Sequence, residues 1–162
     1  MEASPLEPLA AAVLHVPAPE RALVVGCDDG GAALFLAREF PGARVRGVDR
    51  SPDRIREAQA KVGLDPEGRV AFKQAGRRSL PYPDEFFDLI AQTGGPLLPA
   101  ETARVLRPGG FFIHALLRPP RFAPAPRRRL LEWRLAQHYF EPRQEGEAGD
   151  GNFFVARLDR NR

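Results

Sequence analysis

The sequence is poor in the residues that cross-link a chain or bind metals. It contains a single cysteine, Cys27, which excludes a disulfide within the chain and a cysteine-based metal cluster. No apolar run approaches the roughly 20 residues that a membrane-spanning helix needs, and the first residues lack the basic and apolar regions of a signal peptide. These absences predict a cytoplasmic protein with no membrane partner and no metal site.

Lysine is scarce as well. Lys61 and Lys73 are the only lysines, and every other residue counted as Lys or Arg is an arginine. Replacement of lysine by arginine is reported in some thermophilic families, although genomic codon bias explains it equally well. The formal net charge is only +3, but the sequence pI is about 9.6, so the composition permits an acidic partner such as RNA without requiring one.

The rest of the composition is that of an ordinary globular protein. A chain of 162 residues with 43% hydrophobic and 28% charged residues fits one soluble domain. Strand and helix patterns alternate, which predicts a parallel sheet with right-handed crossovers. The predicted strands lie at 21–25, 44–49, 69–74, 86–92 and 110–117, the predicted helices at 5–14, 30–40, 52–61, 99–106 and 127–137, and a terminal antiparallel hairpin at 139–144 and 152–159.

These elements fall into three parts of one predicted domain. Residues 1–20 form an N-terminal helix and lead-in, and Ser4 with Glu7 has the form of a capping box for that helix. Residues 21–117 form the strand and helix units expected to bind a cofactor. Residues 118–162 form a segment rich in proline and arginine, a helix and the hairpin.

The chemistry is concentrated after the first two strands. Gly26 to Gly30 follows an apolar strand and precedes a helix, and Asp49 ends the next strand. Glycine lets backbone approach a ligand closely, and the start of the helix offers unpaired N–H groups. An acid at the tip of the second strand can accept hydrogen bonds from ribose hydroxyls. The pattern predicts a nucleotide pocket.

Four landmarks along the chain carry a resemblance to a known family. Gly26 to Gly30 stands at the place of a glycine loop, Asp49 at that of the second-strand acid, 79–90 at the segment entering the fourth strand, and 103–110 at the turn into the fifth. In this order and spacing they resemble the class I S-adenosylmethionine-dependent methyltransferases. The resemblance implies an α/β, doubly wound, mostly parallel seven-stranded sheet with a C-terminal antiparallel hairpin. It also implies methyl transfer from S-adenosylmethionine to an unknown acceptor.

The resemblance implies a set of donor-binding residues but no catalytic residue. It places Gly26, Asp28 and Gly30 at the donor's amino-acid end, Asp49 with the following Arg50 at the ribose, Gly76 and Arg77 near adenine, and Gln92 beside the transfer path.

Three positions depart from the family pattern. Val24 stands where an acid helps to orient the donor, Asp28 where the loop has its middle glycine, and Gly76 where an acid meets the adenine amino group. Asp28 adds bulk and negative charge to the loop. Its carboxylate either obstructs the donor or takes over the role of the missing acid at position 24.

Other functions stay open. Gly26, Asp28 and Gly31 also have the spacing of a dinucleotide-binding fingerprint, although the chain offers no second domain for a substrate. A second alternative is a non-catalytic protein that keeps the methyltransferase fold as a binding or scaffold module. An arginine cluster, either a solvated surface or an RNA-contacting patch with Phe122 or Trp133 for stacking, consists of Arg118, Arg121, Arg127, Arg128 and Arg129.

Overall fold

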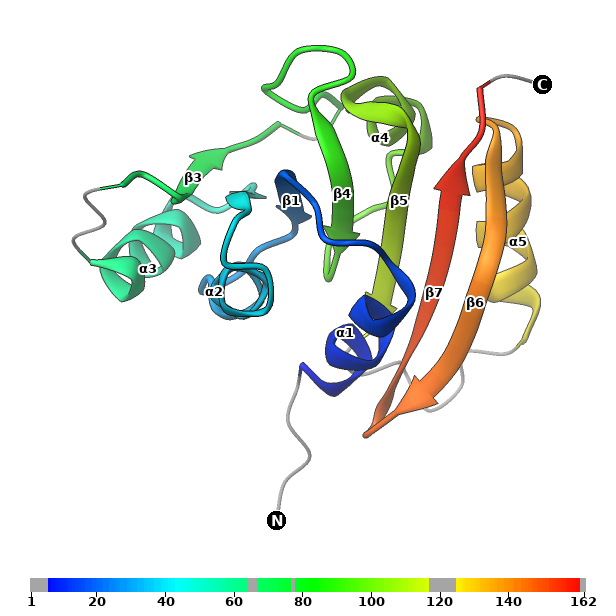
Figure 1. The fold of residues 1–162 in the computed structure, drawn as a ribbon, viewed down its shortest axis with the longest axis horizontal. Helices are drawn as coiled ribbons and strands as arrows, with labels where there is room; N and C mark the ends of the chain where they lie inside the picture. Colours follow the sequence, from blue (N-terminus) through cyan, green and yellow to red (C-terminus); the bar gives the residue numbers. More distant parts are fainter. Residues whose placement is uncertain (1–5, 64–66, 77, 117–124, 161–162) are drawn as a thin grey trace.

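A seven-stranded sheet forms the centre of the computed structural model, which describes residues 6–63, 67–76, 78–116 and 125–160 (Figure 1). The strand order is β3-β2-β1-β4-β5-β7-β6. The strands from β1 to β5 pair in parallel, and β7 runs antiparallel to both β5 and β6. The predicted fold class is thereby confirmed. The strands are β1 (Arg21–Val25), β2 (Arg44–Asp49), β3 (Val70–Gln74), β4 (Phe87–Gln92), β5 (Leu106–Leu116), β6 (Phe140–Ala148) and β7 (Gly151–Leu158).

Helices cover both faces of the sheet. They are α1 (Glu7–Ala12), continued by the 3-10 turn η1 (Val13–His15), α2 (Gly31–Glu39), α3 (Pro52–Val62), α4 (Pro99–Val105) and α5 (Ala125–Ala136). One apolar core contains buried residues of α1, α2 and α3, and the other contains those of α4 and α5. In Figure 1, α1 lies in front of β5 while α5 lies behind β6. Among the described residues, no helix has the length and apolar character needed to cross a bilayer.

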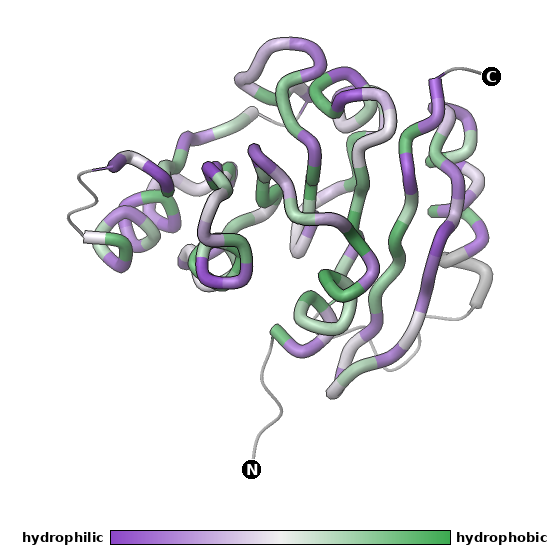
Figure 2. The backbone as a smooth tube through the Cα atoms, in the orientation of Figure 1, coloured by the Kyte–Doolittle hydropathy of each residue, from purple (hydrophilic) through white to green (hydrophobic). Residues whose placement is uncertain are grey.

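Strand burial follows position in the sheet. The side chains of β1 are almost all buried, as expected for a central parallel strand that is covered on both faces. The edge strand β6 is mostly exposed and polar, whereas its neighbour β7 is mostly buried. Figure 2 shows the same contrast, with β6 largely purple and β7 largely green. Polar side chains on an edge strand disfavour pairing with another chain.

Several predicted boundaries differ from the structure: β6 continues to Ala148 where a strand ending at 144 was predicted, and α5 begins at Ala125 where a start at 127 was predicted. The predicted fifth strand starts at residue 110, whereas β5 begins at Leu106 and its pairing with β4 shifts register between Phe87 and Leu89. Gly109 has a φ of 84°, which lets the chain bend there without leaving the sheet. The N-cap of α1 is Leu6, whose side chain makes no capping bond, and Ser4 of the predicted capping box lies outside the described residues.

The connection from β2 to α3 shows why a helix begins there. Ser51 is the N-cap of α3, and its hydroxyl accepts a hydrogen bond from the Arg54 N–H at 3.3 Å. Pro52 occupies the first helical position, where its missing N–H costs nothing. This start directs α3 back along the sheet from the tip of β2.

Candidate functional site

A cavity of about 470 Å³ opens at the carboxyl ends of β1, β2 and β4. After β1 the chain continues through β2 and β3 on one side of β1, and it then crosses over to β4 on the other side. The cavity therefore lies at the topological switch point of the sheet. Its size falls within the range of cofactor sites. The lining residues are Val25, Gly26, Asp28, Val48, Asp49, Arg50, Ser51, Arg54, Ala75, Gly76, Leu80, Thr93, Gly94, Gly95, Pro96 and Leu98.

The first glycine of the loop is held against two neighbouring segments. The Gly26 and Cys27 N–H groups both donate to the Val48 carbonyl at 3.0 Å, and the Thr93 hydroxyl donates to the Gly26 carbonyl at 3.0 Å. Gly26 has a φ of 72°, and a Cβ there would lie 2.3 Å from the Gly94 carbonyl oxygen. Only glycine fits this position, so the loop and residues 93–95 form one wall of the cavity.

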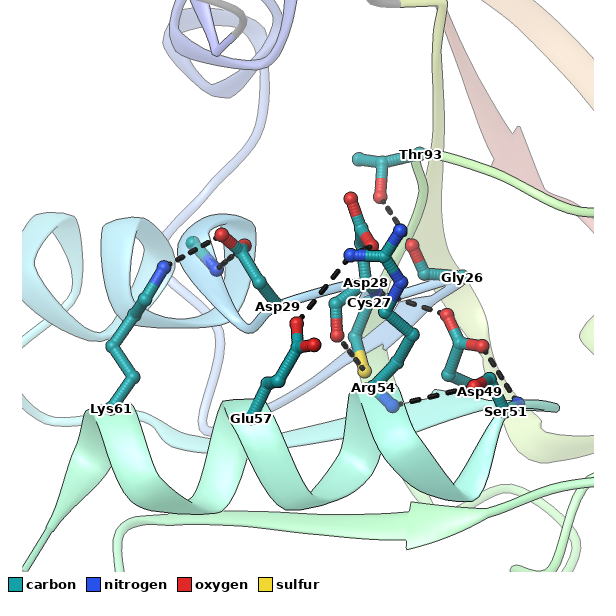
Figure 3. Close-up of polar contacts among 11 residues, drawn as sticks. Gly26, Cys27, Asp28, Asp29, Asp49, Ser51, Arg54, Glu57, Lys61 and Thr93 are labelled. Carbon is teal, nitrogen blue, oxygen red and sulfur yellow. Dashed lines mark hydrogen bonds and ion pairs between the residues drawn. The ribbon is translucent and has the colours of Figure 1, made fainter.

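Asp28 adopts the backbone conformation of the glycine that it replaces. Its φ is 51°, a region in which aspartate is better tolerated than most other side chains. The Asp28 N–H donates to Asp49 Oδ2 at 3.0 Å, and the carboxylate lies 3.0 Å from Arg54 Nη1. Figure 3 shows the Arg54 side chain reaching from α3 toward Asp28. The extra charge in the loop is therefore paired with a cation from the neighbouring helix.

The next loop residue is tied to the same helix. Asp29 Oδ2 lies 2.7 Å from Lys61 Nζ, and its Oδ1 accepts the Gly31 N–H at 3.1 Å (Figure 3). The bond from Lys61 and the backbone N–H hold the pKa of Asp29 below its ordinary value. Gly30, with a φ of 90°, is buried against Ala58 of α3. Gly30 thus packs the loop onto α3 and does not line the cavity.

Asp49 is oriented by backbone donors. Its Oδ2 accepts the Asp28 N–H and its Oδ1 accepts the Ser51 N–H, each at 3.0 Å. An ionised carboxylate has about four acceptor positions, so these two bonds leave capacity for two hydroxyl groups of a ligand. Arg50 follows it on the cavity wall and is exposed. The loop after β1 and the turn after β2 thus hold the Asp49 carboxylate in a fixed orientation at the tip of β2.

The other end of the cavity is mainly apolar. Ala75, Gly76, Leu80 and Leu98 line it, and a Cβ at Gly76 would meet no atom within 4 Å. Apolar walls without a fixed charge suit the flat face of an aromatic base. Arg77, which the resemblance places here, lies outside the described residues.

A network of hydrogen bonds and ion pairs holds the segment of Leu80 against α4. The Leu80 N–H donates to Glu101 Oε2 at 2.7 Å, and Arg104 Nη2 donates to the Leu80 carbonyl at 3.0 Å. Arg104 also donates to the Tyr82 carbonyl at 2.9 Å and to Asp84 Oδ1 at 2.8 Å. The Arg104 guanidinium, which bonds to Glu101, holds the pKa of that carboxyl below its ordinary value. The sequence signals were the 79–90 and 103–110 segments, which contain every residue of this network except Glu101.

Gln92 stabilises the turn at 94–96, which lines the cavity. Its side chain is 1% exposed, and Nε2 donates to the Pro96 carbonyl at 2.8 Å and to the Gly94 and Gly95 carbonyls at 3.2 Å. Its Oε1 is buried and makes no hydrogen bond within the described part of the chain. Gln92 fixes the shape of the 94–96 turn and is not among the residues that line the cavity.

Val24, before the loop, and Cys27, within it, both have apolar surroundings. Val24 is fully buried in the core that includes α1 and α2, and it does not line the cavity. Cys27 is 1% exposed, and burial raises the pKa of its thiol to about 12. A thiol held in its neutral form is a poor nucleophile. Within the described residues, no group of three His, Cys, Asp or Glu side chains is arranged to hold a metal ion.

The helix that carries the second part of the arginine cluster lies away from this cavity, and Arg118 and Arg121 lie outside the described residues. Arg127, Arg128 and Arg129 lie in α5, which packs on β6, whereas the cavity lies between β2 and β4. Of the side chains described in α5, Arg129 is exposed and Trp133 is 60% exposed. Phe122, the second candidate for stacking, lies outside the described residues.

Comparison with known proteins gives consistent similarities. A family model described as "Methyltransferase domain" matches residues 22–110. The chain is 36% identical over 107 residues to a fatty-acid O-methyltransferase of Mycolicibacterium smegmatis. The alignment covers 62% of this chain and 38% of that protein. The chain is 39% identical over 107 residues to the methyltransferase GfsG of Streptomyces halstedii, covering 60% of this chain and 37% of that protein. The chain therefore spans less than half the length of these curated relatives.

The fold similarity extends over more of the chain. The crystal structure of an S-adenosylmethionine-dependent methyltransferase from Aquifex aeolicus superposes with a TM-score of 0.78 at 18% identity, covering 95% of this chain and 91% of that one. A chain from a complex that contains the Haloferax volcanii Trm112 methyltransferase activator gives the same TM-score at 15% identity, covering 96% of this chain and 90% of that chain. At sequence identities of 15% and 18%, these superpositions show a shared fold and nothing more.

Proposed function

Because the chain belongs to the methyltransferase domain family, we propose that it binds S-adenosylmethionine in the switch-point cavity and transfers the methyl group to an acceptor. The orientation of Asp49 is the observation that carries this proposal. Two backbone N–H groups fix its carboxylate at the tip of β2, where it lines the cavity. A fixed acceptor at this place suits the two ribose hydroxyls of an adenosine ligand.

The rest of the cavity fits the remaining parts of that donor. The apolar wall that includes Leu80 and Leu98 would receive the adenine ring, and the Gly26 loop would receive the amino-acid end. The bound donor would supply a methyl group activated by its positive sulfur. The chain's own task is to orient the donor and exclude water, because in-line transfer depends more on position than on a strong base.

The acceptor is a separate part of the proposal. The Mycolicibacterium smegmatis relative acts, by its name, on fatty acids, and a Mycobacterium ulcerans relative, 34% identical over 110 residues, is named a probable phthiotriol/phenolphthiotriol dimycocerosates methyltransferase. An apolar small molecule is therefore the first class of acceptor to test. A cytoplasmic location stays a prediction from the sequence.

Isothermal titration with S-adenosylmethionine and S-adenosylhomocysteine tests donor binding. We expect saturable binding of both ligands, and Asp49→Asn should weaken it about tenfold or more, the cost of a lost bond to a charged acceptor. Asp53→Asn is the control, because Asp53 is an exposed acid of α3 that does not line the cavity. If the wild type shows no binding at about 1 mM ligand, any affinity is too weak to support the proposed function, which is then excluded.

A binding module that contacts RNA is the second candidate. The supporting observation is the exposure of Trp133 and Arg129 on α5, since an exposed ring beside arginines suits a stacked base and its phosphate. This candidate predicts salt-sensitive RNA binding in a filter assay. Binding should fall in the triple alanine variant of Arg127, Arg128 and Arg129, and it should persist in a control triple variant of the exposed Arg38, Arg44 and Arg56. Equal binding by the two variants would exclude this patch.

A further inference from the structure

Asp28 and Arg54 form an ion pair on the rim of the cavity. Asp28 Oδ1 and Arg54 Nη1 lie 3.0 Å apart, and the two side chains are 65% and 50% exposed. Both residues line the cavity, and Figure 3 shows them meeting above α3 next to Asp49. An exposed pair of this kind contributes only about 0–1 kcal/mol to folding. Stability alone gives little reason to place these two charges here.

The backbone of Asp28 strengthens that argument. At a φ of 51° a glycine costs nothing, whereas a residue with a side chain is held there at some cost in free energy. Backbone strain of this kind is concentrated at functional sites. A charged side chain in a position suited to glycine, on the wall of a cavity, indicates a role toward the ligand.

Elimination points to Asp28 as the partner of a cationic ligand group. Val24, where the resemblance expects an acid, is an apolar residue packed in the core. The described residues that line the cavity include two carboxylates, Asp28 and Asp49. Both oxygens of Asp49 already accept backbone N–H groups, which orient the carboxylate for hydroxyl donors. The Asp28 carboxylate is held by Arg54 alone among the bonds of its side chain described here.

We propose that Asp28 and Arg54 together recognise the zwitterionic amino-acid group of the donor, with Asp28 accepting from its ammonium and Arg54 donating to its carboxylate. This inference rests on the proposed function, because it assigns residues to one end of the same ligand. The pair carries one charge of each sign, as the amino-acid group does. Bound together, the four groups alternate in sign, so each charge has opposite neighbours and none is left unpaired at the rim.

Arg54 is thereby a specificity-determining residue that the sequence did not indicate. Its guanidinium is held at the cavity by two carboxylates, because Nη1 lies 3.0 Å from Asp28 Oδ1 and 3.4 Å from Glu57 Oε2. A ligand without an amino-acid group gains nothing from either residue. The pair should therefore separate ligands that share adenosine and differ at this end.

The test is a titration of four adenosine ligands against two variants. The ligands are S-adenosylmethionine, S-adenosylhomocysteine, decarboxylated S-adenosylmethionine and 5′-methylthioadenosine. Asp28→Asn should weaken the first three by about tenfold or more, because all three carry the ammonium group. Arg54→Gln should weaken only the first two, which carry the carboxylate. Neither change should alter the affinity for 5′-methylthioadenosine, which lacks the amino-acid group.

Arg56→Gln is the control, since Arg56 is an exposed arginine of the same helix that does not line the cavity.

Each outcome decides the inference. Equal affinities of wild type and both variants for all four ligands would overturn it, and so would a uniform loss that includes 5′-methylthioadenosine. Thermal melting of each variant separates such a uniform loss from unfolding. If the wild type binds none of the four ligands, the proposed function fails and the inference fails with it. If the wild type binds and the pattern above is missing, only the inference fails.

Discussion

At the scale of single residues, Gly26 has no room for a side chain. A Cβ would lie 2.3 Å from the Gly94 carbonyl oxygen, and the φ of 72° disfavours any residue with a Cβ. Crowding against backbone costs about 1–3 kcal/mol, and the left-handed conformation adds about 1–2 kcal/mol. We expect Gly26→Ala to lower the free energy of unfolding by about 3 kcal/mol in urea titrations, where the crowding and the conformation act together.

Gly76 provides the matched control for that prediction. It lines the same cavity, but a Cβ there would meet nothing within 4 Å. Gly76→Ala should therefore change the free energy of unfolding by less than about 0.5 kcal/mol, as surface changes generally do. Similar losses in the two variants would mean that close packing of the loop on Gly94 is not what requires glycine at position 26.

The sequence identified the loop but not the directions of its side chains. Gly26, Asp28 and Asp49 could be found from local spacing, because a glycine loop and an acid at a strand tip leave a local pattern. The contact between Asp28 and Arg54 joins residues on different elements, so it depends on how α3 packs beside the loop. For the same reason the sequence did not show that Gln92 bonds the 94–96 turn, and its place beside the transfer path stays a prediction.

At the scale of elements, α4 is joined to the segment before β4 by charged groups. Glu101 and Arg104 of α4 bond to each other and to both backbone groups of Leu80. The pKa of Glu101 is lowered in the folded state by the Arg104 bond. A lowered pKa means that the folded state binds the proton less well than the unfolded state. The stabilisation is therefore present above the unfolded pKa and is lost as the pH falls through the folded value.

This sign gives a testable pH dependence. In urea titrations from neutral pH to about pH 3, the wild type should lose stability below about pH 4.5, where an unfolded glutamate takes up its proton. Glu101→Gln should already be less stable at neutral pH, by about 1 kcal/mol, and its stability should fall less on acidification. Glu57→Gln is the control, since Glu57 is exposed and lies 3.4 Å from Arg54. A parallel pH profile for the Glu101 variant and the wild type would contradict this account.

The elements themselves were largely predictable, and the exception has a structural cause. β1 and β2 begin and end where the sequence placed them. For β1 the signal is an apolar run between Pro19 and Gly26, and for β2 it is a short segment between Pro41-Gly42 and Ser51-Pro52. The start of β5 was wrong by several residues. Arg107 to Gly110 has the composition of a turn and has no partner in the β4 register, but Leu106 before it and Phe111 after it both pair with β4, so the segment is a bulge within β5. Pairing between strands leaves no local pattern in the sequence.

At the scale of the whole molecule, the cavity joins two halves of the sheet. β1, β2 and β3 lie on one side of the switch point, and β4, β5, β7 and β6 lie on the other. The loop of Gly26 belongs to the first half and the turn at 94–96 to the second, and both line the cavity. A donor bound there would contact both halves, so binding should oppose any opening of the sheet between β1 and β4.

Donor binding should therefore stabilise the entire domain rather than one loop. At a concentration about 100 times its Kd, a ligand that binds only the folded state adds about 2.7 kcal/mol. For a chain of this length that corresponds to a rise in Tm of about 5–10 °C. Hydrogen exchange should slow most at the amides of 26–30 and 93–95. In β6 and β7 it should slow only as much as the gain in global stability requires. Asp49→Asn at the same donor concentration should show a smaller rise. A rise in Tm with exchange slowed in the β6–β7 hairpin and unchanged at 26–30 would place the donor elsewhere on the molecule.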